Sequence, residues 1–170
     1  WTIAPVVAMN KIAADVEAVI DEAKPVLAGG SITVLTKSRT RIESKVSASA
    51  VAVAAGAKGA KAISVGLSLA RNDILSDAEA SIQGAGALLQ AGGDIQVGAW
   101  RTSAIVANGT ASAVAVAAGA KSAPAVAGGG TLAFNRISGN TDAFASGVTL
   151  KTMAPVSPAK GDVTVEAHDD

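Results

Sequence analysis

The 170-residue chain contains no cysteine and no tyrosine, and its only aromatic residues are Trp1, Trp100, Phe134 and Phe144. The lack of cysteine excludes a disulfide scaffold, a thiolate metal site and a cysteine nucleophile. Hydrophobic residues make up 49% of the chain, but most of them are alanine and valine. Because aromatic rings normally fill much of a globular core, this core is expected to be thin, with closely packed backbones.

The chain also lacks net charge and long apolar runs. Lysine and arginine total 14, as do aspartate and glutamate, so no net field favours nucleic acid or an anionic membrane. The sequence contains no apolar run of about 18 residues, the length that a transmembrane helix needs, and no signal peptide is visible. We therefore expect no nucleic-acid partner and no membrane insertion. Because the chain starts at Trp1, we interpret it as a piece of a longer chain.

An internal repeat is the strongest positive signal in the sequence. The eleven residues ASAVAVAAGAK occur unchanged at 48–58 and 111–121. They belong to a longer unit in which Asn10, Asn72 and Asn135 align. Internal repeats of this length are typical of solenoids and arrays. The sequence thus predicts one repeat domain over 1–170, with units at about 10–71, 72–134 and 135–170.

A second motif fixes the spacing of the units. It reads AGGSITV at 28–34, AGGDIQV at 91–97 and AKGDVTV at 159–165. The spacing of 62 to 63 residues between the first two units grows to 68 at the third. This predicts a five-residue insertion within 144–158, and MAPVSP at 153–158 is the expected place.

The repeat decides between helix and strand. DVEAVIDEAK at 15–24 has helical spacing, but the aligned stretch 77–86 contains Gly84 and Gly86. Each glycine costs roughly 1 kcal/mol in a helix interior. The third copy adds Gly147, Val148 and Thr149. Because equivalent units share one structure, we predict extended structure in all three.

Strict alternation from Ser31 onward predicts a half-buried strand. Even-numbered residues from Ile32 to Ala50 are small or apolar, and odd-numbered residues from Thr33 to Ser49 are mostly charged or polar. Strands rarely exceed about ten residues, so this stretch is expected to bend at polar corners. VAVAAGA at 51–57 is small on both faces and predicts a strand packed tightly on both sides.

Small side chains, alternation and Gly-Gly corners together predict an all-β fold, a parallel β-solenoid or β-helix. A 63-residue unit divides into about three coils of about 21 residues, a usual size for a β-helix. Antiparallel hairpins or a propeller blade remain alternatives for a unit of this length.

The pattern resembles the repeats of giant secreted Gram-negative exoproteins, the leukotoxin-like filamentous adhesins. It is carried by N-x-I, D-x-E-A-x-I, A-G-G-x-I-x-V and the Ala/Val/Gly run, best at 72–97 and 161–167. The chain departs from the pattern at Lys160, where a glycine of AGG is displaced. The resemblance implies an extracellular β-helical stalk with a role in attachment, and it transfers no catalytic residue.

No residue is predicted to be catalytic, cofactor-binding or metal-binding. His168, in EAHDD, is interpreted as part of a solvated tail. The Gly-Asp corners at 91–94 and 161–162 lack the tandem spacing of calcium-binding repeats, so glycine with positive φ and a turn-capping aspartate are expected there. The segment 37–45, with its alternating Lys and Arg, is interpreted as a solvated face, with a docking patch for an anionic glycan or a neighbouring chain as the alternative. Trp100 is interpreted as a corner filler, with a sugar platform as the alternative. The three aligned asparagines are expected to lie about three coils apart, too far for one ladder.

The sequence therefore predicts a structural, non-enzymatic module of a large secreted or cell-surface adhesin. Its expected partners are neighbouring repeats or identical chains, stacked end to end, and host or matrix glycans are the alternative partners. The alternatives are a subunit that polymerises by strand stacking and a glycan-binding β-helix surface. An ice-binding face is disfavoured because threonines do not align between units, and a polysaccharide-processing enzyme because no polar cluster recurs.

Overall fold

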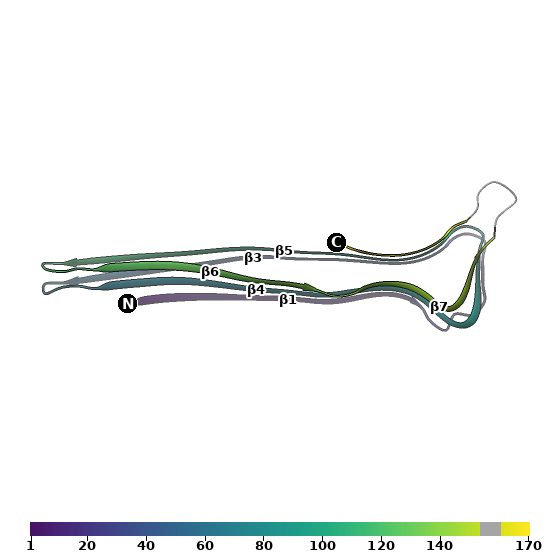
Figure 1. Cartoon of the computed structure of the whole chain (residues 1–170), viewed down its shortest axis with the longest axis horizontal. Coiled ribbons are helices and arrows are strands. Elements are labelled where there is room, and N and C mark those ends of the chain that lie inside the picture. Colours follow the sequence, from purple (N-terminus) through teal and green to yellow (C-terminus); the bar gives the residue numbers. More distant parts are fainter. Residues whose placement is uncertain (154–160) are drawn as a thin grey trace. The chain divides into compact units, whose positions relative to one another are not determined.

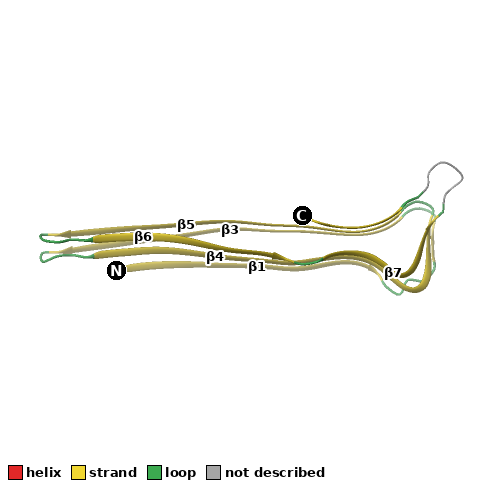
Figure 2. Ribbon diagram, in the orientation of Figure 1, coloured by secondary structure: helices red, strands yellow, loops and turns green. Residues whose placement is uncertain are grey.

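In the computed structural model, which describes residues 1–153 and 161–170, all regular structure is β-strand (Figure 2). The strands are β1 (Thr2–Ile20), β2 (Val26–Ala28), β3 (Ile32–Gly56), β4 (Ala62–Ala91), β5 (Ile95–Gly119), β6 (Ala125–Ser138), β7 (Thr141–Thr152) and β8 (Val163–Asp169). The prediction of an all-β fold is confirmed. Residues 15–20, whose local spacing also fits a helix, belong to strand β1, and the aligned residues 77–86 belong to strand β4.

The strands are far longer than the sequence indicates. β3 runs for 25 residues without a corner, so the predicted bend at polar residues is wrong. Three inward-facing hydroxyls of β3, those of Thr36, Ser38 and Thr40, find partners inside, whereas Ser44 Oγ has none among the described residues. Ser38 Oγ lies 2.9 Å from Ser76 Oγ, and Thr36 Oγ1 donates to the carbonyl of Glu79 at 2.6 Å. A buried polar group with a hydrogen-bond partner has no need to reach solvent.

Two sheets alternate along the chain. Sheet A has the order β1-β4-β2, and β6 and β7 also pair with β4, whereas sheet B has the order β3-β5-β8. Figure 1 shows β1, β4 and β6 running side by side. The pairs β2–β4, β4–β7 and β5–β8 are all parallel. The prediction of parallel strands is thus confirmed for these pairs.

The register joins each strand to the strand one repeat unit away. Asn140 and Asp77, which are bonded neighbours, are 63 residues apart, and Asp162 and Asp94 are 68 apart. Coils of about 21 residues would instead pair strands one third of a unit apart. The prediction of three coils per unit is therefore not confirmed, because neighbouring strands differ by one whole unit.

The change of offset places the insertion. The β4–β7 offset is 63 residues up to Gln83↔Ser146 and falls to 61 from Ala87↔Val148 to Ala91↔Thr152, so the bulge removes two residues. The offset is 68 at Asp94 and Asp162. Seven extra residues therefore enter between Thr152 and Asp162, and the net difference from the 63-residue offset is the predicted five. The predicted place, 153–158, falls in this span, but 154–160 lie outside the described residues.

The chain divides into two compact units, each built from all three repeats. Unit 1 comprises Trp1–Lys11, Arg41–Asp73 and Ala104–Ile137, and unit 2 comprises Ile12–Thr40, Ile74–Ser103 and Ser138–Asp170. The core of unit 2 is made of small and aliphatic side chains, which are Val34, Ala78, Ala80, Ile82, Ala87, Leu89, Val97 and Ala99. In unit 1 the buried residues are equally small, for example Ile42, Val46, Ala48, Ala62 and Ala70.

The predicted faces of β3 are confirmed almost residue by residue. Every even-numbered residue from Val34 to Ala52 is buried, and every odd-numbered residue over the same stretch is exposed. The prediction that 51–57 packs on both sides is wrong, because Val51 and Val53 are 59% and 73% exposed. We call the side of each sheet that carries the buried residues its inner face and the opposite side its outer face.

The Gly-Gly corners depend on close approach and not on positive φ. Among the described glycines, positive φ occurs at Gly59, Gly86, Gly139 and Gly147, none of which belongs to the corner motif, so that expectation is wrong. Instead, a Cβ at Gly92 would lie 2.4 Å from the carbonyl oxygen of Gly29, one unit earlier. Contacts this short are possible only for glycine.

The aspartate of the corner motif bonds to the next unit. Asp94 Oδ1 accepts the backbone N–H of Asp162 at 3.0 Å, and Ser31 Oγ accepts the N–H of Asp94 at 3.1 Å. The prediction that this aspartate caps a turn is therefore wrong, because its bonds run between units and do not close a turn.

We predict that Gly92→Ala lowers the thermal stability while Gly29→Ala does not. Nothing lies within 4 Å of a Cβ built on Gly29, so the two substitutions differ in the space available at the same corner. Overpacking typically costs about 1–3 kcal/mol. Thermal unfolding followed by circular dichroism measures the difference, and equal melting temperatures would contradict the stacking of the corners.

Candidate functional site

The aligned asparagines form a ladder through the interior of unit 1. Asn10 Nδ2 donates to Asn72 Oδ1, and Asn72 Nδ2 donates to Asn135 Oδ1, both at 2.8 Å. Asn72, in the middle, is 0% exposed. The prediction that these residues are too far apart for a ladder is wrong, because it assumed three coils per unit. With one unit between neighbouring strands, equivalent side chains touch.

Arg101 is an inward-facing cation that the motifs of the sequence did not single out. It is 5% exposed, its Nη1 donates to the carbonyl of Ser76 at 3.1 Å, and its Nη2 pairs with the Asp169 carboxylate. Gly139 provides the space, since a Cβ there would lie 2.6 Å from Nη1. Arg101 Nε has no partner among the described residues. The alternation could have revealed this residue, because Arg101 stands one unit after the inward-facing Ser38.

The basic segment lies on a solvated face, as predicted. Lys37, Arg39, Arg41 and Lys45 are all exposed on the outer face of β3. Trp100, however, is not a corner residue, because it lies within β5. Its ring covers Gly98, where a Cβ would come within 2.3 Å of the indole.

An aromatic and cationic hollow surrounds Trp100 in unit 2. The Lys37 ammonium lies 5.5 Å from the centre of the Trp100 ring, a favourable cation–π distance. Lys37, Arg39, Trp100 and Thr102 line a shallow hollow of about 230 Å³. Two cations beside an indole ring are suited to an acidic ligand with an apolar face.

His168 belongs to a strand and not to a tail. It lies in β8, where it is the direct partner of Trp100 on β5. Its Nε2 is 2.9 Å from Asp170 Oδ1, and both side chains are about three-fifths exposed. The predicted solvation is confirmed, whereas the tail conformation is wrong.

Acidic residues also stack in register, on the outer face of sheet A in unit 2. A hollow of about 190 Å³ is lined by Asp15, Glu17, Asp77, Glu79, Asn140 and Asp142, together with Val16 and Ala78. Glu79 and Asp142 are direct partners in the β4–β7 register. Within 1–153 and 161–170, however, no group of three or more His, Cys, Asp or Glu residues is arranged to hold a metal ion.

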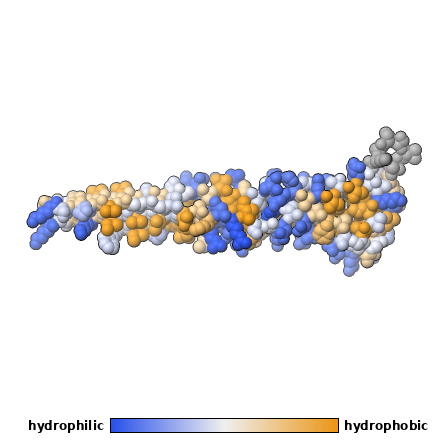
Figure 3. All heavy atoms as spheres, in the orientation of Figure 1, coloured by the Kyte–Doolittle hydropathy of each residue, from blue (hydrophilic) through white to orange (hydrophobic). Residues whose placement is uncertain are grey.

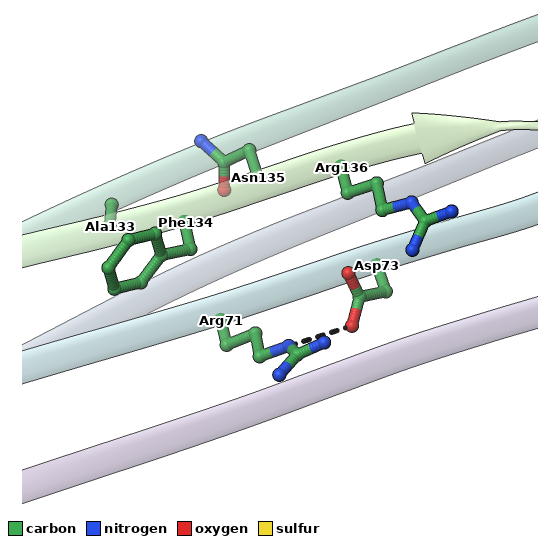
Figure 4. Close-up of a pocket in the computed structure, with 6 residues that line it drawn as sticks. All are labelled: Arg71, Asp73, Ala133, Phe134, Asn135 and Arg136. Carbon is green, nitrogen blue, oxygen red and sulfur yellow. Dashed lines mark hydrogen bonds and ion pairs between the residues drawn. The ribbon is translucent and has the colours of Figure 1, made fainter.

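Another hollow, of about 570 Å³, lies on the outer face of sheet A in unit 1. Figure 4 shows Phe134 and Arg136 on β6 facing Arg71 and Asp73 on β4, while Asn135 points to the other side of the strand. Arg71 Nε is 3.0 Å from Asp73 Oδ2. This hollow marks a charged border beside the apolar residues of the same face.

Comparisons with family models, with curated proteins and with solved structures find no match. The resemblance to giant exoproteins therefore stays a prediction. No helix in the described part of the chain has the length and apolar character needed to cross a membrane.

We predict that Asn72→Ala destabilises the protein by about 1–3 kcal/mol, because it removes two buried hydrogen bonds worth about 0.5–1.5 kcal/mol each. Asn135→Ala removes one bond at an exposed position and should cost clearly less. Urea unfolding of both variants measures the difference. If the two variants lose the same unfolding free energy, the two hydrogen bonds of Asn72 do not determine the stability at this position.

Proposed function

We propose that the chain is a structural module, a segment of a parallel β-solenoid in which one 63-residue repeat forms one coil. The observation that carries the proposal is the agreement between the sequence repeat and the strand register. Asn10, Asn72 and Asn135 align in the sequence, and their side chains bond in the same order. A repeat that pairs with its own next copy can be extended without changing any contact.

The alternation of the sheets supports this coil. β1 and β2 belong to sheet A, β3 to sheet B, β4 to A, β5 to B, β6 and β7 to A, and β8 to B. The chain thus visits each sheet once per repeat. A coil with two sheets and a thin aliphatic interior is well suited to a structural module whose length increases with each added repeat.

The proposed place of this module is a stalk or fibre of a large secreted or cell-surface adhesin, as the resemblance implies. End-to-end stacking is part of the same proposal. In unit 1, Asn10 Oδ1 and Asn135 Nδ2 have no hydrogen-bond partner among the described residues. One is an acceptor and the other a donor, so a further repeat or a second chain can continue the ladder in either direction.

Duplicating one repeat tests the proposal. A second copy of 72–134 inserted after residue 134 should add one coil and raise the melting temperature, because stability in repeat proteins grows with the number of neighbour contacts. The control duplicates only the first third of the unit, about 21 residues, which would be a whole coil in a conventional β-helix. We expect this control to lower stability. If the shorter insert is the stabilising one, the one-coil repeat is wrong.

A second candidate function is the binding of acidic polysaccharide, which is favoured by the hollow at Trp100. The ring is bordered by Lys37 and Arg39 on a solvated strand face. Sulfate or carboxylate groups on a sugar chain can pair with these cations while a sugar ring stacks on the indole.

Heparin, used as a sulfated probe, should bind the wild-type chain and bind Trp100→Ala about tenfold more weakly, a loss of ~1.4 kcal/mol. Trp1→Ala is the matched control, because Trp1 is 90% exposed and lies outside the hollow. Affinity measured by titration calorimetry should also fall with added salt. Equal affinities for the two variants would exclude the hollow as the site.

A further inference from the structure

The outer face of sheet A in unit 1 is an exposed apolar surface built from three neighbouring strands. We define the apolar face by Ile3, Val7 and Met9 on β1, Leu67 on β4, and Leu132 and Phe134 on β6. Met9 is 73% exposed, Ile3 65%, and Leu132 and Phe134 about 55% each. In Figure 3, apolar residues are grouped along the part of the molecule that carries β6. Exposed patches of this kind mark interaction sites.

The amount of exposed apolar area matches what a stable pair of chains needs. From their exposed fractions, the six residues present roughly 700 Å² per copy, close to the ~800 Å² per partner of a standard protein–protein interface. Sheets of this kind pack face to face with interdigitating side chains. A pairing that buries most of this face therefore approaches the size of a standard interface.

The face carries both a projection and a recess, on the same strand. A hollow of about 450 Å³ is lined mainly by apolar residues, including Pro5, Leu67 and Gly130. Gly130 contributes no side chain to fill it. Phe134 lies on the same side of β6, two outward positions further on, and projects into solvent. Shape of this kind is self-complementary if the two copies run in opposite directions.

We propose that the apolar face pairs with the same face of a second copy of this chain, in a closed two-fold dimer. The two-fold axis lies in the plane between the two paired faces and crosses the strands. It passes over Val7 on β1, Leu69 on β4 and Leu132 on β6, which are neighbours at the same sequence offsets as the three asparagines of the ladder. Each Phe134 then lies over Gly130 of the other copy, and Leu132 lies over its own equivalent. Such an isologous contact closes after two copies.

The charged border favours this opposed direction. Lys11 and Arg136 lie at one end of the face, in the same row as Asp73 of β4, and Arg71 lies one outward position nearer the axis, where it pairs with Asp73. In a pair that runs in the same direction with β4 over β4, Arg136 would face Lys11, and Asp73 would face Asp73. In the opposed pair, each Arg136 faces Gly128 at the end of the interface, and each Arg71 lies over Leu67 of the other copy and keeps its own partner Asp73.

Sedimentation velocity on the 170-residue chain tests the proposal. The wild type should form a dimer, and Leu132→Asp should be monomeric. Val114→Asp is the matched control, because Val114 is 52% exposed on the outer face of sheet B in the same unit. This variant should stay dimeric. Circular dichroism checks that both variants keep the strand content and melting temperature of a folded chain.

Cross-linking provides a second readout that does not depend on a disruptive substitution. The chain has no cysteine, so Leu132→Cys carries a single thiol beside the proposed axis. Packed sheets lie about 10 Å apart, too far for a disulfide but within reach of a short bis-maleimide. Leu132→Cys should give a covalent dimer, and Val114→Cys should not.

Three results would overturn the proposal. The first is a wild-type monomer at all concentrations. The second is an open series of oligomers that Leu132→Asp leaves unchanged, which would mean strand-edge stacking and not face pairing. The third is a monomer that binds phosphatidylcholine vesicles through Leu132, which would make lipid the occupant of the apolar face. Because a closed dimer and an open series differ in size distribution, failure here is distinguishable from failure of the proposed solenoid.

Discussion

Parallel pairing between each strand and the strand one repeat later is the interaction on which the rest of the structure depends. It sets the neighbours in the two sheets, because the spacing between repeat copies, 62 or 63 residues over most of the chain and 68 at β8, is also the hydrogen-bond offset. The 30-residue strand β4 is thereby paired on both sides, and the 25-residue strand β3 is paired with β5. Long strands are unusual in ordinary sheets. Here they require only that each sequence repeat pairs in register with the next repeat.

This pairing places like residues on like residues, and the consequences differ with chemistry. An asparagine can both donate and accept, so stacked asparagines form a ladder. Stacked glycines allow corners to approach at distances that any Cβ would block. Stacked carboxylates, as at Glu79 and Asp142, gather charge of one sign on the outer face. Valine and leucine columns produce exposed apolar surfaces in the same way.

The interior shows how the fold accepts polar residues when they find partners. Serine and threonine hydroxyls meet across the sheets, and Arg101 has a carbonyl, a carboxylate and the space left by Gly139. Burying a guanidinium without such partners would be costly. The inner face is thus defined by size and bonding more than by hydrophobicity, whereas the outer faces at Trp100 and at Leu132 carry the groups that can meet other molecules.

The sequence by itself determined the extended structure, the period of the repeat and the side of β3 that is buried from Val34 to Ala50. Alternation is local, so the even-numbered residues from Val34 to Ala50 could be assigned to the inner face without knowing any partner. The pairing partner of each strand could not be read in this way, because a strand alternates identically whichever strand it pairs with. Only long-range hydrogen bonding decided that Asn10 meets Asn72 and that Arg101 lies inside with Asp169. Trp100 and His168 were likewise placed by pairing between β5 and β8, since a residue's cross-strand neighbour is set by register and leaves no mark in its own local sequence.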